Sequence, residues 1–475
     1  ILKSSNILLP EFEKANETDL LIAIKAESEQ IATNAFEKIE KLLFEIKHKN
    51  DNIKNFYPKS FESALKILPD ANLCLISIAG KYAAQEALKA LDNGLNVMIF
   101  SDNVSLEDEI KLKNYAAKKK LLLMGPDCGT AIINGVPLAF ANATNKGNIG
   151  IIAASGTGLQ EVSSLISEAG CGISQAIGTG SRDIKDEVGG IMFIESLKAL
   201  GKDDNTKIIL LISKPPHPNT LNKIINETKK INKPIIALFL GAKPDLISKT
   251  GIIYANTLEE SALIAVALSK NDDCKSIQNN AYLKDLEISK LAQKLASKTK
   301  GKYLRGLYSG GTLCYEAQLI LSNYIDEIYS NTPINNKFKL KNSLKSINNT
   351  VIDLGDDEFT IGKPHPMIYF SLRMKQLYEE AKNKEVGVIL MDIVLGYGAN
   401  LNPLNDIIPV IKKIKKIRKD LIIICPIIGT AKDPQNKNEI IHSLTNNGVI
   451  VAESNAYASK LAGNIIKLKG VEYVF

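Results

Sequence analysis

Short apolar runs alternate with helix-like stretches along the whole chain. Residues 28–47 repeat apolar side chains every three or four positions, as a helix with one buried face does. Further helices are expected at 82–92 and 105–118. The runs expected to form buried strands are residues 19–26, 73–80, 96–100 and 121–125. Continuous apolar strands separated by helices indicate parallel sheets that are covered on both faces.

The alternation restarts at residue 148 and again at residue 302. In the second unit the expected strands are residues 148–154, 172–178, 208–213 and 234–241. A lysine-rich helical stretch over 275–299 leads into the third unit, whose apolar runs are residues 302–308, 387–396, 421–429 and 448–454. The segment 324–350, rich in Asn, Lys and Ser, is expected to be a long excursion. Three α/β units therefore account for the chain.

Composition narrows the class of protein. The chain has 475 residues, 45% of them apolar, with a formal net charge of +7 from 59 basic and 52 acidic residues. The lysines are spread over helical stretches, which favours a solvated surface over a nucleic-acid site. No apolar run is long enough to span a membrane, and no signal peptide is evident. Six scattered cysteines and four scattered histidines predict neither a metal site nor disulfides, as expected for a cytoplasmic protein.

Two small-residue corners share one design, an apolar strand followed by Ser, Gly and Thr and then by a helix. The residues of the first corner are Ser155, Gly156, Thr157 and Gly158, and those of the second are Ser309, Gly310, Gly311 and Thr312. Each following helix carries an early glutamate, Glu161 or Glu316. The free amides at a helix N-terminus attract anions, so a phosphate or a carboxylate fits each corner. A simple helix cap also uses these residue types, and neither corner is a P-loop.

Two further loops carry polar candidates. The stretch MGPDCGT (124–130) contains Asp127 and Cys128 at a sharp reversal, where a domain-linking turn is the alternative to a site. Arg182 and Asp183 lie in a glycine-rich loop that follows an expected strand. Open α/β sheets bind ligands at the carboxyl ends of their strands, although a solvated loop fits this sequence equally well.

The stretch DLGDDEFTIGKPHPMI (353–368) is the most unusual. It places Lys363 and the proline-flanked His365 behind Asp353, Asp356 and Asp357, which could orient the ring or tune its pKa. This arrangement suits proton transfer or phosphate contact as well as a structural role. Gly398 and Asn400 follow the apolar run that ends near 396 and complete the candidate pocket residues.

Several of these stretches together resemble one known family. MGPDCGT, SGTG, SKPP, ALFLG, GLYSGGTL, DLGDD and GKPHPMI, in this order along the chain, are similar to the FdrA family. More widely, the corner at 155–158 and its surroundings resemble the α subunit of succinyl-CoA synthetase and the NDP-forming acyl-CoA synthetase superfamily.

The resemblance implies an α/β fold of three domains and a short linker. A CoA-binding-like Rossmann domain is expected at 1–145. Two flavodoxin-like ligase domains with parallel sheets are expected at 146–275 and 301–475, with a helical linker at 276–300. In the superfamily, two helix N-termini face each other across the phosphate of a phosphohistidine. This places residues 155–157 opposite residues 309–312.

The sequence departs from the synthetases in three respects. The glycine-rich CoA loop that the resemblance implies at the first strand of the first domain is not visible. The strand at 234–241 leads into GAKPDLISKTG, which has no histidine where the synthetases carry their phosphohistidine. The chain also shows no ATP-grasp module. The FdrA resemblance implies instead a subunit that transfers an acyl or carbamoyl group, as in oxamate carbamoyltransferase, with His365, Lys363 and Arg182 as catalytic candidates.

Ligands and partners follow from the same resemblance. Phosphate or carbamoyl phosphate is the expected ligand of a small-molecule enzyme, and CoA remains open. Separate protein subunits are expected to complete the enzyme, and a homodimer is open. The alternatives are an acyl-CoA ligase half that borrows a nucleotide-binding partner and a non-catalytic scaffold that binds CoA or phosphate.

Overall fold

A computed structural model of the chain describes residues 9–10, 12, 21–49, 58–244, 247, 250–273, 275–361 and 363–470. The described residues divide into two compact bodies, one within 1–71 and 360–363, the other within 72–359 and 364–475. The first body contains α1 (Glu29–Lys49), which confirms the helix expected at 28–47, and α2 (Phe61–Ile67).

The strand expected at 19–26 is wrong for its described part. Residues 21–26 form no strand, and residues 19 and 20 lie outside the described ranges. An apolar run becomes a strand only when a neighbouring strand takes up its backbone hydrogen bonds. Within the described chain, residues 21–26 have no such neighbour.

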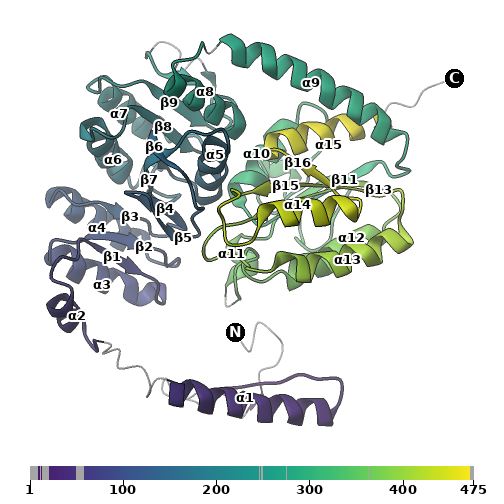
Figure 1. Cartoon of the computed structure of the whole chain (residues 1–475), viewed down its shortest axis with the longest axis horizontal. Coiled ribbons are helices and arrows are strands. Elements are labelled where there is room, and N and C mark those ends of the chain that lie inside the picture. The colour runs from purple at the N-terminus through teal and green to yellow at the C-terminus, as the bar shows by residue number, and fades with distance from the viewer. Residues whose placement is uncertain are drawn as a thin grey trace. The chain divides into compact units, whose positions relative to one another are not determined.

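Three sheets form the second body (Figure 1). The first sheet is parallel, in the order β1 (Leu73–Ile76), β2 (Asn96–Ile99), β3 (Leu123–Met124). Its helices are α3 (Gly80–Asp92) and α4 (Leu106–Lys118), which confirm the two helices expected here. Helix α3 buries Ala83, Ala87 and Leu91 on one face. The apolar positions of the sequence pattern are therefore buried here.

The second sheet has seven strands in the order β10-β9-β8-β6-β7-β4-β5. Their bounds are β4 (Thr130–Ile133), β5 (Val136–Ala139), β6 (Lys146–Ala153), β7 (Ile173–Gly178), β8 (Ile208–Ser213), β9 (Ile235–Phe239) and β10 (Ile253–Tyr254). Strands β6 to β10 are parallel, and the hairpin β4–β5 pairs antiparallel to β7. Its covering helices are α5 (Gly156–Glu168), α6 (Ile191–Lys202), α7 (Pro218–Thr228) and α8 (Leu258–Lys270).

The second sheet thus begins before the boundary that we expected at residue 145. The hairpin turn explains why. Asn134 and Gly135 both have positive φ, 52° and 80°, as a two-residue hairpin turn of the favoured hand requires. This turn returns the chain along β4, so residues 130–139 join the second sheet instead of the first.

The third sheet is parallel and runs β12-β11-β13-β15-β14, with β16 beside β15. Its strands are β11 (Tyr303–Tyr308), β12 (Thr350–Asp353), β13 (Val386–Met391), β14 (Ile393–Val394), β15 (Ile422–Ile428) and β16 (Ile450–Ala452). Its helices are α10 (Gly311–Leu321), α11 (Asp357–Thr360), α12 (Ser371–Lys382), α13 (Pro403–Ile417), α14 (Lys437–Asn446) and α15 (Asn455–Gly470). Residues 324–349 form the expected excursion, with one short 3-10 helix at Asn336–Phe338.

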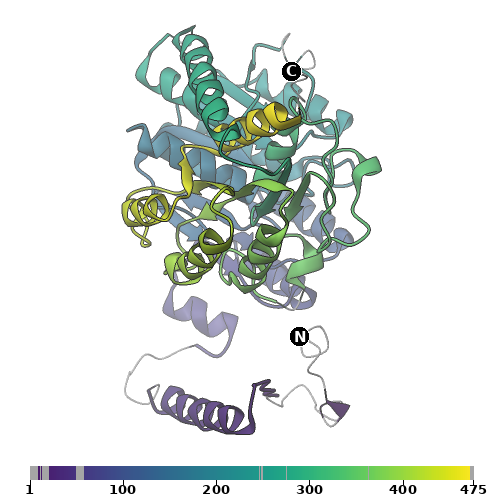
Figure 2. The ribbon, with the colours of Figure 1, turned by 90° about the vertical axis from the view of Figure 1, so that its right-hand side faces the viewer.

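The lysine-rich stretch is the helix α9 (Lys275–Ala296), which lies along α15 (Figure 2). Ile288 and Ala292 of α9 are buried in the apolar core that the second and third sheets share, and Lys460 of α15 pairs with Asp285 at 2.7 Å. The stretch expected as a linker is therefore part of the core. No helix within the described ranges is long and apolar enough to cross a membrane.

The second and third sheets are joined by an exchange of helix caps. Glu161 of α5 accepts a hydrogen bond of 2.8 Å from the backbone N–H of Asn455, the first residue of α15. Glu316 of α10 accepts one of 2.7 Å from the N–H of Leu258, the first residue of α8. The Asn455 side chain also donates to Glu316, at 2.8 Å. Each glutamate stands at the sixth position of its helix and binds a helix N-terminus across the same junction.

The two glutamates are both fully buried, which affects their ionisation. Burial raises the pKa of Glu161 well above its ordinary value, and the nearby Glu316 raises it further. Burial also raises the pKa of Glu316, to about 7. At these two sites the folded protein therefore binds more protons than the unfolded chain above about pH 4.5, and their contribution to stability falls as pH rises through this range.

The variant Glu161→Gln tests this linkage. The amide keeps an acceptor for the Asn455 N–H and replaces an oxygen, Oε2, that has no hydrogen-bond partner in the described structure. Between pH 4.5 and 8 we expect the free energy of unfolding of the wild type to decrease relative to that of the variant, by at most about 1.4 kcal/mol per unit of pKa shift that the substitution removes. Urea unfolding at several pH values measures both slopes.

The matched control is Glu187→Gln, because Glu187 is exposed in a loop of the same body. The free energy of unfolding of this control should change with pH as steeply as that of the wild type. Equal slopes in all three proteins would contradict a buried, proton-binding carboxyl pair.

Candidate functional site

The two small-residue corners meet. Ser155 caps α5, and its Oγ accepts a hydrogen bond of 3.0 Å from the N–H of Gly158. The same Oγ lies 2.6 Å from Oγ1 of Thr312 in the first turn of α10, a hydrogen bond between the two corners. A side chain at Gly310 would lie 2.8 Å from Thr157, so glycine permits this close approach. Figure 1 shows α5 and α10 beside each other between the second and third sheets.

The N-terminus of α5 faces an unpartnered hydroxyl. Thr130, the first residue of β4, is 2% exposed, and its Oγ1 has no hydrogen-bond partner in the described structure. Within 4 Å of the position that a Cβ on Gly156 would take, Thr130 Oγ1 is the atom present, at 3.5 Å. A buried hydroxyl without a partner is costly. The open side of Gly156, the helix amides and this hydroxyl together form a place where an anion would be bound.

The second corner is already occupied by a carboxylate of the protein. Asp392, which follows β13, accepts hydrogen bonds from the Ser309 N–H at 2.8 Å, the Ser309 hydroxyl at 2.9 Å and the Gly310 N–H at 3.0 Å. Its charge is balanced by Arg373 at 2.7 Å, and both side chains are buried. Ser309 and Gly310 therefore hold an internal anion, whereas Gly311 and Thr312 begin the helix beyond it.

A second carboxyl group, that of Asp353, lies against the start of α10. A Cβ on Gly311 would lie 2.7 Å from Asp353 Oδ2, so the missing side chain makes room for this group. Its other oxygen accepts a hydrogen bond of 2.9 Å from the Gly355 N–H. Burial, with smaller effects of Asp356 and Asp392, raises the pKa of Asp353 to about 7. A carboxyl group with this pKa can give or take a proton near neutral pH.

His365 reaches the same place. A Cβ on Gly355 would lie 3.0 Å from His365 Nε2, 3.2 Å from Asp353 Oδ1 and 2.5 Å from the Ser309 carbonyl oxygen. The ring accepts a hydrogen bond of 3.2 Å at Nδ1 from the Met367 N–H, so the neutral ring carries its proton on Nε2. Burial, with a smaller effect of Arg373, lowers the pKa of His365 to about 4. His365 is thus a neutral donor beside the second corner.

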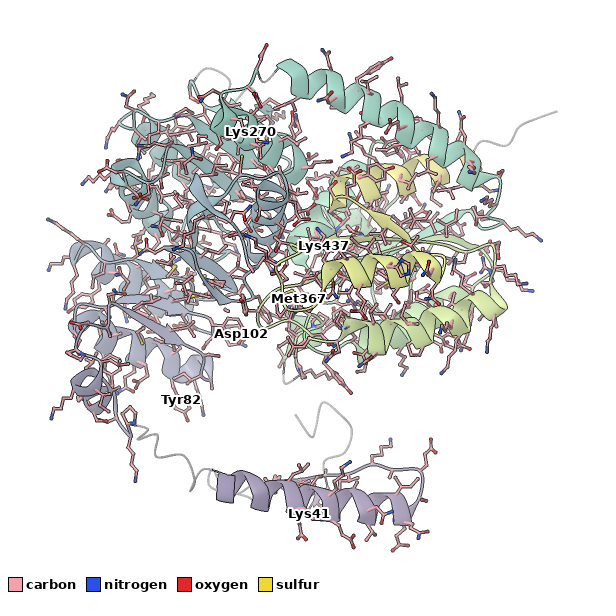
Figure 3. All side chains as sticks on the ribbon, in the orientation of Figure 1. Lys41, Tyr82, Asp102, Lys270, Met367 and Lys437 are labelled. Atoms are coloured by element: carbon pink, nitrogen blue, oxygen red, sulfur yellow. The ribbon has the colours of Figure 1, made fainter. Side chains whose placement is uncertain are left out.

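The candidate residues near 400 support the histidine loop. The Asn400 N–H donates to the Met367 carbonyl at 2.9 Å, and its side chain donates to Asp406 at 3.0 Å. Phe140 lies 5.8 Å from the His365 ring, centre to centre, and it packs beside Gly398. Figure 3 labels Met367, two residues after His365, where the loops of the third sheet approach the second. Asn400 therefore supports the loop that carries His365, and Gly398 makes room for the Phe140 ring that packs against His365.

Arg182 and Asp183 lie in a different cluster, at the contact with α4. Arg182 pairs with Glu109 at 2.7 Å and donates to the Val104 carbonyl. Asp183 pairs with the buried Lys113 at 2.9 Å and accepts the N–H of Phe193 at 2.7 Å. These side chains tie the first sheet to the second and are engaged in the described structure.

The other candidates have distinct surroundings. Burial raises the pKa of the Cys128 thiol to about 12, and the thiol donates to the Gly178 carbonyl, so it is a poor nucleophile. Surrounding protein, with Asp102 and Asp357 nearby, raises the pKa of Asp127 to about 7. Lys363 is exposed and belongs to the first body, in a turn closed by its N–H to Thr360.

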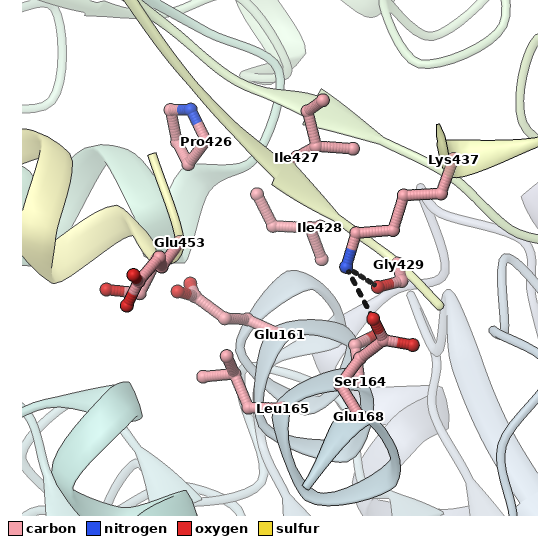
Figure 4. A pocket seen from close by; sticks show the side chains of 11 residues that line it. Glu161, Ser164, Leu165, Glu168, Pro426, Ile427, Ile428, Gly429, Lys437 and Glu453 are labelled. Atoms are coloured by element: carbon pink, nitrogen blue, oxygen red, sulfur yellow. Dashed lines mark hydrogen bonds and ion pairs between the residues drawn. The ribbon is translucent and has the colours of Figure 1, made fainter. Parts of the chain in front are cut away.

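A small recess runs along the flank of α5 (Figure 4). Glu161, Ser164 and Leu165 line one side, and the end of β15 lines the other. Lys437 at its rim donates to the Gly429 carbonyl at 2.7 Å and pairs with Glu168 at 3.2 Å. None of the corner residues lines this recess, so it is separate from the site.

Comparison with known proteins places this arrangement in a family. A model of CoA-ligase domains matches residues 307–465, and a model of CoA binding domains matches residues 144–241. The uncharacterized protein YahF of Escherichia coli K12 is 42% identical over 480 residues, which cover 99% of this chain and 91% of that protein. The chain belongs to the FdrA-like family of the NDP-forming acyl-CoA synthetase superfamily. The expected family and α/β fold are confirmed.

Relatives of this FdrA-like protein include subunits of ligases. The α subunit 1 of the ADP-forming succinate–CoA ligase of Archaeoglobus fulgidus is 27% identical over 176 residues, 36% of this chain and 59% of that subunit. The α subunit from Staphylococcus aureus Mu50 is 31% identical over 148 residues, 30% of this chain and 47% of that subunit. A solved acetyl-coenzyme A synthetase 1 of Ca. Korarchaeum cryptofilum aligns over 84% of this chain and 85% of its own, with 15% identity and a TM-score of 0.37. The CoA binding domain match falls on the second sheet, whereas we expected the CoA-binding-like domain at 1–145.

Three polar residues of the site were not selected from the sequence: Thr130, Lys214 and Asp392. Asp353 was expected only as one of three aspartates that could orient the His365 ring or tune its pKa. Thr130 ends MGPDCGT, and its position opposite α5 depends on the hairpin β4–β5. Asp353 and Asp392 each stand at the end of a strand, Asp353 as the last residue of β12 and Asp392 directly after β13. Acidic residues at the carboxyl ends of parallel strands were the available signal. Lys214 follows β8, and its ammonium group lies over the Tyr315 ring of α10.

The variant Thr130→Val tests the anion site. Removing a hydroxyl that has no protein partner should leave stability unchanged or raise it. If the hydroxyl binds phosphate, the dissociation constant should rise about tenfold or more, because a hydrogen bond to a charged group contributes about 1.5–3 kcal/mol. Calorimetric titration with phosphate and thermal unfolding measure the two effects.

Thr179→Val is the matched control. Thr179 also has a buried hydroxyl without a partner in the described structure, but it follows β7, and its carbonyl accepts a hydrogen bond of 2.9 Å from Lys113 of α4. Its phosphate affinity should equal that of the wild type. Equal affinity in both variants would remove Thr130 from the site, and a loss of stability in Thr130→Val would assign it a structural role.

Proposed function

We propose that this FdrA-like protein transfers an acyl group, and specifically a carbamoyl group, to and from phosphate at the meeting point of α5 and α10. The reaction is that of an oxamate carbamoyltransferase, in which oxalurate and phosphate give oxamate and carbamoyl phosphate. The observation that carries the proposal is the contact of Ser155 with Thr312, which pairs two helix N-termini beside the unpartnered Thr130 hydroxyl. The family membership supports acyl transfer as the class of chemistry.

The groups at the site match the steps of this reaction. Phosphate, bound by the first amides of α5 and by Thr130, attacks the carbamoyl carbon of oxalurate through one oxygen. The carbonyl oxygen gains negative charge, which the N-terminus of α10 and the Thr312 hydroxyl stabilise. The bond from the carbamoyl carbon to nitrogen then breaks, and the nitrogen of oxamate takes a proton. Asp353, with its pKa near 7, is placed to donate that proton.

His365 contributes as a neutral hydrogen-bond donor. Its pKa of about 4 means that the ring is uncharged at neutral pH, with the proton on Nε2. The ring can therefore donate to a phosphate or a carbonyl oxygen without adding a positive charge. In this proposal its part is to polarise the reacting group beside Asp353 rather than to form a phosphohistidine.

The proposed ligands are phosphate and carbamoyl phosphate, and CoA is a further candidate because a CoA binding domain model matches residues 144–241. We also propose that separate subunits complete the enzyme in the cytoplasm. The succinate–CoA ligase relatives are named as α subunits, which supports a chain that works with partners.

A second function is favoured by the two family matches themselves. A CoA-ligase half would form an acyl-CoA with a nucleotide supplied by a partner subunit. This function predicts transfer of the γ-phosphate of ATP to a histidine of the complex. Incubation with γ-32P-ATP, followed by mapping of acid-labile label, distinguishes it, because carbamoyl transfer requires no labelled histidine.

The direct test of the proposed function is an assay of carbamoyl phosphate formed from oxalurate and phosphate, with and without co-purified partner proteins. We expect formation that is dependent on phosphate. Because Asp353 must be protonated to donate, the rate in this direction should fall as pH rises above about 7. Absence of carbamoyl phosphate with every partner present, together with a labelled histidine, would favour the ligase function.

The variant His365→Asn tests the donor beside the second corner. General acid–base and donor groups contribute about 100- to 10,000-fold, so turnover should fall at least about tenfold while the unfolding temperature stays nearly constant. The exposed His442 on α14 offers the control His442→Asn, which should retain full turnover. If His365→Asn keeps its turnover but unfolds several degrees earlier, the histidine is structural.

A further inference from the structure

Lys214 lies at the carboxyl end of β8 in the second sheet, next to α10. It follows Ser213, the last residue of β8, and precedes Pro215 and Pro216. A residue before proline is restricted to extended backbone, so the direction of the side chain is set by a stiff segment. Carboxyl ends of parallel strands are where open α/β sheets bind ligands.

The ammonium group of Lys214 reaches the first turns of α10. Nζ lies 4.9 Å from the centre of the Tyr315 ring, a cation–π contact. Burial raises the pKa of both Asp353 and Cys314, and the charge of Lys214 opposes this rise at each. Asp353 is the carboxyl group beside Gly311, and Tyr315 lies four residues further along α10, so the ammonium faces the beginning of this helix.

Lys214 differs from the arginines of the same body in having no carboxylate partner. Arg373 pairs with Asp392, and Arg182 pairs with Glu109. Among the described residues, no ion pair engages the Lys214 ammonium, and its side chain is exposed. The backbone before Pro215 and the Tyr315 ring hold the Lys214 ammonium in place, and no anion of the described protein pairs with it. Such a cation is suited to bind an anionic group of a ligand.

We propose that Lys214 binds the carboxylate of the second substrate, the acceptor or donor of the transferred group, beside the phosphate held at α5. This proposal rests on the proposed function for the position of the phosphate. It adds the residue that recognises the second substrate, through the carboxylate that this molecule carries close to the reacting nitrogen. Lys214 is thus a residue that determines specificity and is separate from the groups that bind phosphate or move protons.

The test uses the full chain and the variants Lys214→Met and Lys214→Arg. Oxamate is the probe for the carboxylate, and phosphate is the probe for the α5 site, each titrated by calorimetry. We expect Lys214→Met to weaken oxamate binding about tenfold or more and to leave phosphate affinity within about twofold of the wild type. In the transfer assay, KM for oxalurate should rise more than kcat falls. Lys214→Arg should restore part of the oxamate affinity.

Two controls separate the possible failures. Lys223→Met removes an exposed lysine of α7 and should change neither titration. Gly156→Val should weaken phosphate binding, because its side chain would project toward Thr130 Oγ1, and it reports on the proposed function.

The outcomes are then distinct. Loss of oxamate binding in Lys214→Met supports the assignment even if no transfer activity is found. Unchanged oxamate affinity in Lys214→Met, or a wild type that binds no oxamate, overturns it even if Gly156→Val shows that phosphate binds as proposed.

Discussion

The exchange of helix caps between α5, α8, α10 and α15 is the constraint on which the site depends. Glu161 and Glu316 are buried, and each binds the first backbone N–H of a helix that belongs to the other sheet. Four helices are thereby held at one junction. Because both glutamates lie one to two turns into their helices, the exchange fixes the two helix starts next to each other. The contact of Ser155 with Thr312 is the result.

The same junction explains why the two corners are not equivalent. The α10 corner already holds the carboxylate of Asp392, which is balanced by Arg373. The α5 corner has no internal anion in the described structure and faces a hydroxyl, Thr130, that no protein group satisfies. The α10 corner, whose internal anion is Asp392, holds Asp353 and His365 in fixed positions, and the α5 corner can bind a ligand. The third sheet therefore supplies the groups that act on the ligand, and the second sheet supplies the groups that bind it.

Much of the fold could be predicted because the sequence pattern is local. The helix at 105–118 buries Leu112 and Ala116, as the spacing of its apolar residues predicts. The helix at 28–47 forms as predicted, but the expected buried face is not found in its described part, where Ile31 and Leu42 are exposed. The corners were found because each combines a strand end, small residues and a helix start within one short segment. The turn at Asn134–Gly135 is a recognisable hairpin signal that moves a domain boundary, whereas the strand expected at 19–26 depended on a partner that the pattern could not supply.

The rest of the site depends on contacts between distant segments. Glu161 was recognisable as an early helix glutamate, but its partner Asn455 is 294 positions away along the chain. Thr130 and Lys214 acquire a role only when α5 and α10 lie against them. Arg182 is a plausible anion ligand by type, and only the fold shows that Glu109 engages it.

The central claim is that an anion binds between the amides at the start of α5 and the Thr130 hydroxyl, opposite Thr312. A crystal structure of the full chain with selenate, an anomalously scattering analogue of phosphate and sulfate, tests this claim most directly. The account predicts an anomalous peak within hydrogen-bond distance of the Gly156 and Thr157 amides and of Thr130 Oγ1. A peak confined to other sites, in crystals of protein that binds phosphate in solution, would contradict it.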